Sequence, residues 1–256
     1  MIVAITLEIA KNPKEPGLLL ERAEVYRAHG DLATARRDIQ AALDIKPDFH
    51  PARVRLALVA RDEGQLEESL RLLGLVVEAQ PNQPFARSVR SDVLRRLNRH
   101  AEAVADLDAI LANPDVNPIP QLYLDKARSQ LAMPSPETNA VIAGIDKGLG
   151  RLGPVPSMLM LALELEEQSG RLDDALRRMD ALIKDAPRKE FWLDRRGDIL
   201  LRAGRKGDAL KTFGEAISRI DALPERQRLT VATTELRASI EAKLAPLKPT
   251  GKTSTP

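Results

Sequence analysis

At 256 residues, the chain is long enough for one large domain or two ordinary ones. Its 39 Lys and Arg residues nearly balance its 37 Asp and Glu residues, which argues against the basic surface of a nucleic-acid-binding protein. It has no cysteine, which excludes disulfides, thiolate metal sites and cysteine nucleophiles. Ala, Leu, Arg and Glu are abundant and aromatic residues make up only 3% of the chain, so the composition favours an all-α protein.

A regular period runs through the first third of the sequence. The same interval separates Gly30 from Gly64 and Pro47 from Pro81. A glycine after a helix adopts the left-handed backbone conformation at low cost, and a proline ends the helix before it. Each block therefore predicts a hairpin of two helices with a glycine turn between them.

The predicted elements follow in chain order. Residues 1–14 correspond to the second helix of an incomplete unit, because Pro13 lies one full period before Pro47. Six units follow, at residues 16–49, 50–83, 84–116, 118–153, 156–188 and 189–223. In the third unit Asn98 takes the place of the turn glycine, and the fourth is irregular because Pro134 stands there. Residues 224–246 are predicted to form one capping helix, and residues 247–256 a disordered tail.

Small residues recur at two fixed places around each turn and predict close packing of the two helices. They lie seven residues before the turn and five residues after it, at Ala23, Ala57, Ser91 and Gly197, and at Ala35, Ser69, Ala103, Ala175 and Ala209. Larger apolar residues follow nine residues after the turn, at Ile39, Leu73, Leu107, Met179 and Phe213. A single hairpin would leave these side chains in water, so the hairpins must stack.

This pattern resembles the tetratricopeptide repeat family over residues 1–223. The resemblance implies a right-handed α-solenoid of stacked helix–turn–helix hairpins, whose first helices line a concave groove that holds peptides or partner proteins. The sequence is also similar to small stand-alone bacterial members of the family, some of which are exported. Together with the incomplete first unit, this favours a periplasmic chain whose signal has been removed, with a cytoplasmic chain as the alternative.

No motif predicts an enzyme, a metal site or a cofactor. The segment from Gly148 to Gly153 matches G-x-G-x-x-G, but a dinucleotide site needs a strand before it, and here it ends a predicted helix. His29, His50 and His100 have no spacing that would bring ligands together. No segment approaches the roughly 20 apolar residues of a membrane-spanning helix.

Arginines recur three residues before each of the first three turns, and they suggest a binding groove. One interpretation is purely structural: these cations complement the helix dipole. The other is functional: they form a basic stripe that binds an acidic peptide. Trp192 is expected to fill the gap to the preceding hairpin, and the neighbouring Phe191 to be an exposed anchor. The candidate groove residues are Arg27, Arg61, Arg95, Arg96, Leu20, Glu24, Val54, Arg55, Leu58, Asp92 and Phe191.

The resemblance also allows one specific partner to be judged. In the carboxylate clamp that some family members use for chaperone C-termini, the corresponding places hold Leu20, Glu24, Arg55, Phe85 and Val89 here. Four of these five have the wrong charge or polarity, so a chaperone tail is not expected.

The sequence therefore predicts a non-enzymatic scaffold that binds a peptide or partner protein, with an acidic segment as one form of that partner. Two alternatives remain open. One is a helical-repeat nucleic-acid binder, and the other is a subunit that self-assembles through its N-terminal edge.

Overall fold

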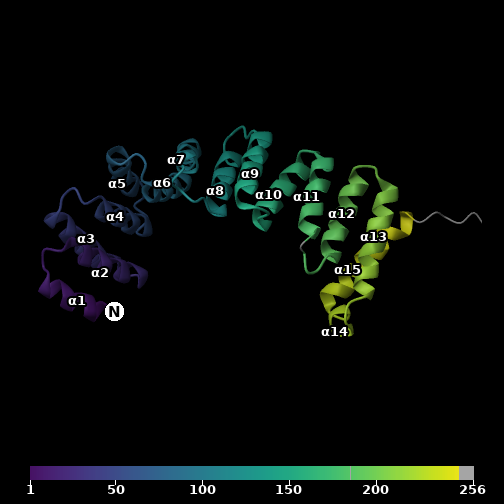
Figure 1. Cartoon of the computed structure of the whole chain (residues 1–256), viewed down its shortest axis with the longest axis horizontal. Coiled ribbons are helices and arrows are strands. Elements are labelled where there is room, and N and C mark those ends of the chain that lie inside the picture. Colours follow the sequence, from purple (N-terminus) through teal and green to yellow (C-terminus); the bar gives the residue numbers. More distant parts are fainter. Residues whose placement is uncertain (185, 248–256) are drawn as a thin grey trace, which may run out of the picture. The chain divides into compact units, whose positions relative to one another are not determined.

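The computed structural model describes residues 1–184 and 186–247, and its regular elements over these residues are helices. The contacts divide the chain into two compact units, residues 1–137 and residues 138–256. Figure 1 labels the helices of both units. The described fold is thus the all-α solenoid of helical hairpins that the repeat predicted.

The first unit is a run of antiparallel hairpins in which each second helix packs on the first helix of the next hairpin. Its helices are α1 (Ile2–Lys11), α2 (Pro16–Ala28), α3 (Leu32–Ile45), α4 (His50–Asp62), α5 (Leu66–Ala79), α6 (Pro84–Arg96), α7 (His100–Ala112) and α8 (Pro120–Leu131). The helix α1 packs on α2 and thus takes the place of a second helix.

The second unit continues the same pattern. Its helices are α9 (Thr138–Leu152), α10 (Pro156–Gln168), α11 (Leu172–Lys184), α12 (Glu190–Arg202), α13 (Lys206–Asp221), α14 (Glu225–Arg228), α15 (Val231–Leu244) and the 3-10 turn η1 (Ala245–Leu247). The division between the units falls inside the predicted unit 118–153, and the six-unit scheme stays a prediction. No helix among residues 1–184 and 186–247 has the length and apolar character needed to cross a membrane.

The turns have the left-handed conformation that the repeat predicted. The φ angles of Gly30 and Gly64 are 82° and 78°, and Asn98 reaches 58° in the same position. The segment that resembled a dinucleotide motif ends α9, and Gly153 just after it also has a positive φ of 80°. This segment is therefore a helix end.

The turn glycines can be tested directly. Gly64→Ala is expected to lower the free energy of unfolding by about 1 kcal/mol, because a side chain in the left-handed region costs roughly 1–2 kcal/mol. Asn98→Gly should be neutral or slightly stabilising. Gly74→Ala is the control, since Gly74 lies inside α5 with open space around it and alanine favours a helix. Urea denaturation of the three variants measures this, and equal loss at Gly64 and Gly74 would contradict it.

The predicted small residues lie in the core. Ala23 is 1% exposed and Ala57 and Ala35 are fully buried, so the helix backbones approach closely there. The hydroxyl of Ser69 donates to the carbonyl oxygen of Ala57 at 2.7 Å and satisfies its own polar group inside the hairpin. The larger residues that follow are buried too, namely Ile39, Leu73, Leu107, Met179 and Phe213.

The end of the second unit differs from the prediction of a single capping helix over residues 224–246. The helix α14 is only one turn long, and α15 begins again at Val231, where the Thr230 side chain caps it by accepting from the backbone N–H of Thr233. Of the predicted tail, Leu247 belongs to η1, and residues 248–256 lie outside the described residues.

The last long helix is attached to α12 by charge. Lys243 of α15 pairs with Asp194 and Asp198 of α12, each at 2.8 Å. Burial raises the pKa of Asp194 despite the opposing pull of Lys243. The two ion pairs of Lys243 thus attach α15 to α12 at the end of the second unit.

Candidate binding site on the first helices

The recurring arginines of the first unit form a series of ion pairs between successive first helices. Arg27 of α2 contacts Asp62 of α4 at 2.7 Å, and Arg61 of α4 contacts Asp92 of α6 at 3.4 Å. Arg95 of α6 contacts Asp125 of α8 at 2.8 Å. We call these three contacts the arginine pairs. They match each arginine with a carboxylate on the next first helix, so the arginines do not form an unpaired basic stripe.

Further contacts tie acidic residues of the site to their neighbours. The side chain of Glu24 accepts hydrogen bonds from Arg27, the nearer at 2.6 Å, and lies 3.2 Å from Arg55. The hydrogen bond from Arg27 is the main reason why the pKa of Glu24 is lowered. Burial would raise the pKa of Asp62, but hydrogen bonds from Arg61 and Arg27 outweigh it and lower the pKa. Both carboxylates are therefore held in their charged form.

The lowered pKa of Glu24 predicts a pH-dependent contribution to stability. A lowered carboxylate pKa stabilises the fold above the ordinary value of 4.5, and this stabilisation is lost as the pH falls through the folded-state pKa. Glu24→Gln should therefore lower the free energy of unfolding by up to about 1 kcal/mol at pH 7, as for partly exposed ion pairs. The difference from the wild type should shrink as the pH falls below 4.5, because Glu24 itself then becomes neutral.

Urea denaturation at pH 7, 4 and 3 measures this difference. Glu21→Gln is the control, because Glu21 is exposed on the same helix and has no ion pair within residues 1–184 and 186–247. A Glu24→Gln effect that is constant from pH 7 to pH 3 would contradict the assignment.

Three of the predicted groove residues are not on the surface. Val54 and Leu58 are 2% and 5% exposed, because α4 packs through them against its neighbours. Leu20 is 8% exposed. The prediction that these three present their side chains to a partner is wrong for Val54 and Leu58, and Leu20 contributes only the little surface it shows to a pocket. Arg96 is about half exposed and contacts Asp92 at 3.2 Å.

An open pocket between α2 and α4 brings three of the predicted residues together. We call it the Leu20 pocket, and it has a volume of about 420 Å³. It is lined by Gly17, Leu20, Glu21, Glu24, Val25, Pro51 and Arg55. Its walls come from two successive first helices, which are in direct contact. The pocket thus joins three residues of the predicted groove, Leu20, Glu24 and Arg55.

A second feature of this face was missed at the level of sequence. Pro51, Phe85 and Ile119 follow one another at the period of the repeat, at or beside the first turns of α4, α6 and α8, and all are exposed. We call these three residues the apolar column. Phe85 is 47% exposed and Ile119 is 57% exposed, whereas most large apolar side chains of the unit are buried. Their periodic spacing was the signal available in the sequence.

In the second unit a phenylalanine, Phe191, stands at the corresponding place. Phe191 precedes the turn residue Gly204 by the same interval that separates Phe85 from Asn98. Phe191 is 44% exposed, and Trp192 is partly buried against the core. Each phenylalanine has an arginine over its ring, Arg55 at 5.9 Å from the Phe85 ring centre and Arg188 at 5.4 Å from that of Phe191. The two exposed rings are thus held in similar surroundings.

Ion pairs across the hairpins were also missed. Arg22 holds Asp38 through two hydrogen bonds of 2.7 Å, and Arg90 holds Asp106 through two of 2.6 Å. In both pairs the arginine lies eight residues before the turn residue and the aspartate eight residues after it. An Arg…Asp spacing centred on a turn would have identified them. These pairs fix the two helices of a hairpin to each other.

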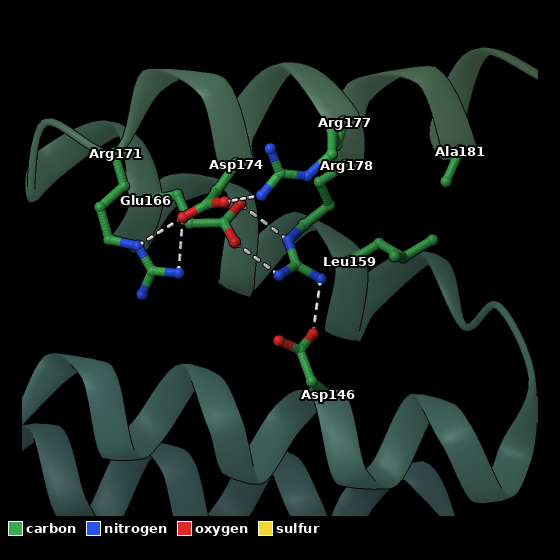
Figure 2. A pocket seen from close by; sticks show the side chains of 8 residues that line it. All are labelled: Asp146, Leu159, Glu166, Arg171, Asp174, Arg177, Arg178 and Ala181. Carbon is green, nitrogen blue, oxygen red and sulfur yellow. Dashed lines mark hydrogen bonds and ion pairs between the residues drawn. The ribbon is translucent and has the colours of Figure 1, made fainter.

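The second unit has a charged pocket of about 410 Å³, shown in Figure 2. Arg178 of α11 lies between Glu166 of α10 and Asp146 of α9, with hydrogen bonds of 2.5 and 2.8 Å to Glu166 and 2.9 Å to Asp146. Arg171 and Arg177 both pair with Asp174. The three arginines and three carboxylates of the lining balance and are paired, so this pocket has no charge left over for a ligand. The hydrogen bonds of Arg178 join α9, α10 and α11.

Two findings concern metal binding and acid–base chemistry. Within residues 1–184 and 186–247, no three His, Asp or Glu side chains lie together in a way that would hold a metal ion. Among these same residues, the buried Nδ1 atom of His100 finds no hydrogen-bond partner, carboxylates included. His100 borders an open pocket at the α6–α7 turn. A histidine that no carboxylate orients is a poor candidate for a general base.

Comparisons with known proteins agree with the repeat pattern. Residues 26–93 and residues 159–224 each match a tetratricopeptide repeat family. No match is found among curated proteins.

Solved structures share the fold at low sequence identity. A tetratricopeptide repeat protein from Parabacteroides merdae is 18% identical, with a TM-score of 0.56 over 92% of this chain and 94% of its own. The Pseudomonas aeruginosa pilF structure is 15% identical, with a TM-score of 0.58 over 88% of this chain and 97% of its own. PilW, described as a type IV pilus biogenesis factor, is 18% identical, with a TM-score of 0.54 over 83% of this chain and 96% of its own. From the matched segments, the turn geometry and the helical hairpins, the chain belongs to the tetratricopeptide repeat family, whose members are generally non-enzymatic scaffolds.

Proposed function

We propose that this chain is a non-enzymatic scaffold and that the first-helix face of residues 1–137 binds an extended or helical segment of a partner protein. The observation that carries the proposal is the apolar column. Exposed aromatic and apolar side chains in register on neighbouring helices are typical of protein interaction sites. Because the helices beneath them are fixed by the arginine pairs, binding would require little ordering of the scaffold.

The charges of this face bear on the partner. An acidic segment was one expectation from the recurring arginines, but Arg27, Arg61 and Arg95 each have a carboxylate within 3.4 Å. The field that would attract an acidic segment or a nucleic acid is thereby reduced. The apolar column, rather than the arginines, is therefore the proposed source of affinity.

Selection of peptides from a random display library on the purified full chain tests the proposal. Peptides selected on the wild type should bind Phe85→Ser about tenfold or more weakly, as expected for an aromatic hot spot. Leu75→Ser is the matched control, because Leu75 is an exposed apolar residue of α5, a second helix, with 41% exposure against 47% for Phe85. It should bind as the wild type does. Failure to select any peptide, or equal loss in both variants, would contradict the proposal.

A second candidate function rests on α1. Val3 and Leu7, one turn apart on this helix, are 73% and 60% exposed, which is unusual for apolar helical residues. We infer that two copies could associate through this N-terminal edge. Light scattering across a range of concentrations tests this. The mass of the wild type is expected to rise to that of a dimer as the concentration increases, whereas Val3→Ser/Leu7→Ser should remain a monomer. A concentration-independent monomer would exclude it.

A further inference from the structure

We propose that the Leu20 pocket recognises a partner segment in which an apolar side chain stands next to a lysine or arginine. This inference rests on the proposed function, because it specifies which segment the first-helix face binds. The expected charge of the partner is thus positive, whereas the recurring arginines Arg27, Arg61 and Arg95 suggested a negative one. The pocket combines an apolar floor with a rim whose charges do not cancel.

The apolar part of the pocket comes from both helices. Leu20 and Val25 of α2 are each 8% exposed and form its buried floor, and Pro51 of α4 borders it. Gly17, in the first turn of α2, also lines it. The volume of about 420 Å³ lies within the range of ligand pockets, roughly 300–1,000 Å³. It therefore has room for one large apolar side chain of a bound segment.

The rim of the pocket has an excess of negative charge. Three charged residues line it, Glu21, Glu24 and Arg55. Glu24 is already bonded to Arg27 and lies 3.2 Å from Arg55, so these charges satisfy one another. Glu21 is exposed and has no ion pair or side-chain hydrogen bond within residues 1–184 and 186–247. The remaining charge at the mouth is thus a carboxylate, which attracts a cation and repels an acidic segment.

The pocket is continuous with the apolar column. Pro51 belongs to both, and Arg55 lies between the pocket and the ring of Phe85, 5.9 Å from the ring centre. A segment that contacts Phe85 can therefore place a further apolar side chain over Leu20. A basic residue beside that side chain then lies within reach of Glu21.

Three synthetic peptides separate the contributions. The first is Gly-Ser-Leu-Lys-Leu-Lys-Ser-Gly, acetylated and amidated; the second replaces both lysines by glutamate, and the third replaces both leucines by serine. Each is titrated into the ¹⁵N-labelled full chain, and amide shifts are followed by NMR. The leucine–lysine peptide is expected to shift the amide signals of Gly17, Leu20 and Glu21. It should bind about tenfold more tightly than either of the other two.

Charge reversal at the rim gives the second comparison. In Glu21→Lys the preference should invert, so that the leucine–glutamate peptide binds more tightly. Glu78→Lys is the matched control, because Glu78 is an exposed glutamate on α5 and away from the pocket, and the wild-type preference should persist. Circular dichroism checks that both variants remain folded.

Two results would overturn the inference. One is that the leucine–lysine peptide shows no preference over the leucine–glutamate peptide or shifts amides only outside the pocket. The other is that Glu21→Lys leaves its affinity unchanged. If library peptides still require Phe85 in either case, the proposed function stands and only this partner chemistry is wrong. If no peptide of any kind binds, both fail.

Discussion

Gly197→Ala is expected to destabilise the second unit by about 2 kcal/mol or more, as overpacking of a tight core does. A Cβ atom at residue 197 would come within 2.3 Å of the Phe213 ring, which is fully buried. The ring has little space to move, because α12 and α13 are packed face to face around it. Alanine also favours a helix over glycine by roughly 1 kcal/mol, so the measured loss is the clash minus this gain.

Urea denaturation followed by circular dichroism measures the loss. Gly214→Ala is the control, since Gly214 lies inside α13 with open space around it. This variant should be more stable than the wild type. Adding Phe213→Leu to Gly197→Ala should recover part of the stability by removing the clash. A Gly197→Ala variant as stable as Gly214→Ala would show that the two helices are not in the close contact described.

Arg178→Met is expected to cost about 3–5 kcal/mol, the usual effect of removing one partner from a buried ion pair. Glu166 is 1% exposed, and its two oxygens are held by Arg178 at 2.5 and 2.8 Å. Without the arginine, a buried carboxylate is left without its partner. Arg178→Met also removes the hydrogen bond to Asp146 and so weakens the attachment of α9.

Two variants give this prediction its controls. Arg177→Met removes an arginine from the same helix whose side chain is 72% exposed, and it should cost less than about 1 kcal/mol. The double variant Arg178→Met/Glu166→Leu should recover much of the stability, because an apolar pair can replace a buried ion pair. If Arg178→Met and Arg177→Met have the same thermal midpoint, the Arg178 contacts do not hold the unit together.

The backbone features could be predicted because they depend on local chemistry that repeats. A regular turn needs a residue that tolerates the left-handed conformation, and a close approach of two helices needs a small residue, so Gly30 and Ala23 could be identified from the sequence. Asn98 followed the same reasoning, and its φ of 58° agrees. The break between α14 and α15 was not predicted because no glycine or proline separates the two helices.

The arginine pairs could not be predicted because the carboxylate partners do not keep the period. The partner of Arg27 lies one position beyond a full period, and that of Arg61 lies three positions short of it. Long arginine side chains reach whichever carboxylate lies near in space, so register alone does not select the partner. Replacing Arg27 and Arg61 by glutamate would place carboxylates against Asp62 and Asp92. Such a variant tests stability as much as binding.

The sequence also could not show which residues of the predicted site are buried. Val54 and Leu58 occupy the expected positions on a first helix, but neighbouring helices cover them. Phe85 and Phe191 remain exposed because they lie in the first turn of their helices, beyond the packed interior. Position along the helix, and not only the face, decides which side chains a partner can reach.

Site-specific photocrosslinking in the native cell tests the binding face most directly. The photoreactive residue p-benzoylphenylalanine is placed at position 85 in one version of the full chain and at position 75 in another. A discrete protein adduct from position 85, absent from position 75, is the predicted result. No adduct at position 85, or the same adducts from both positions, would contradict a partner site on the first helices.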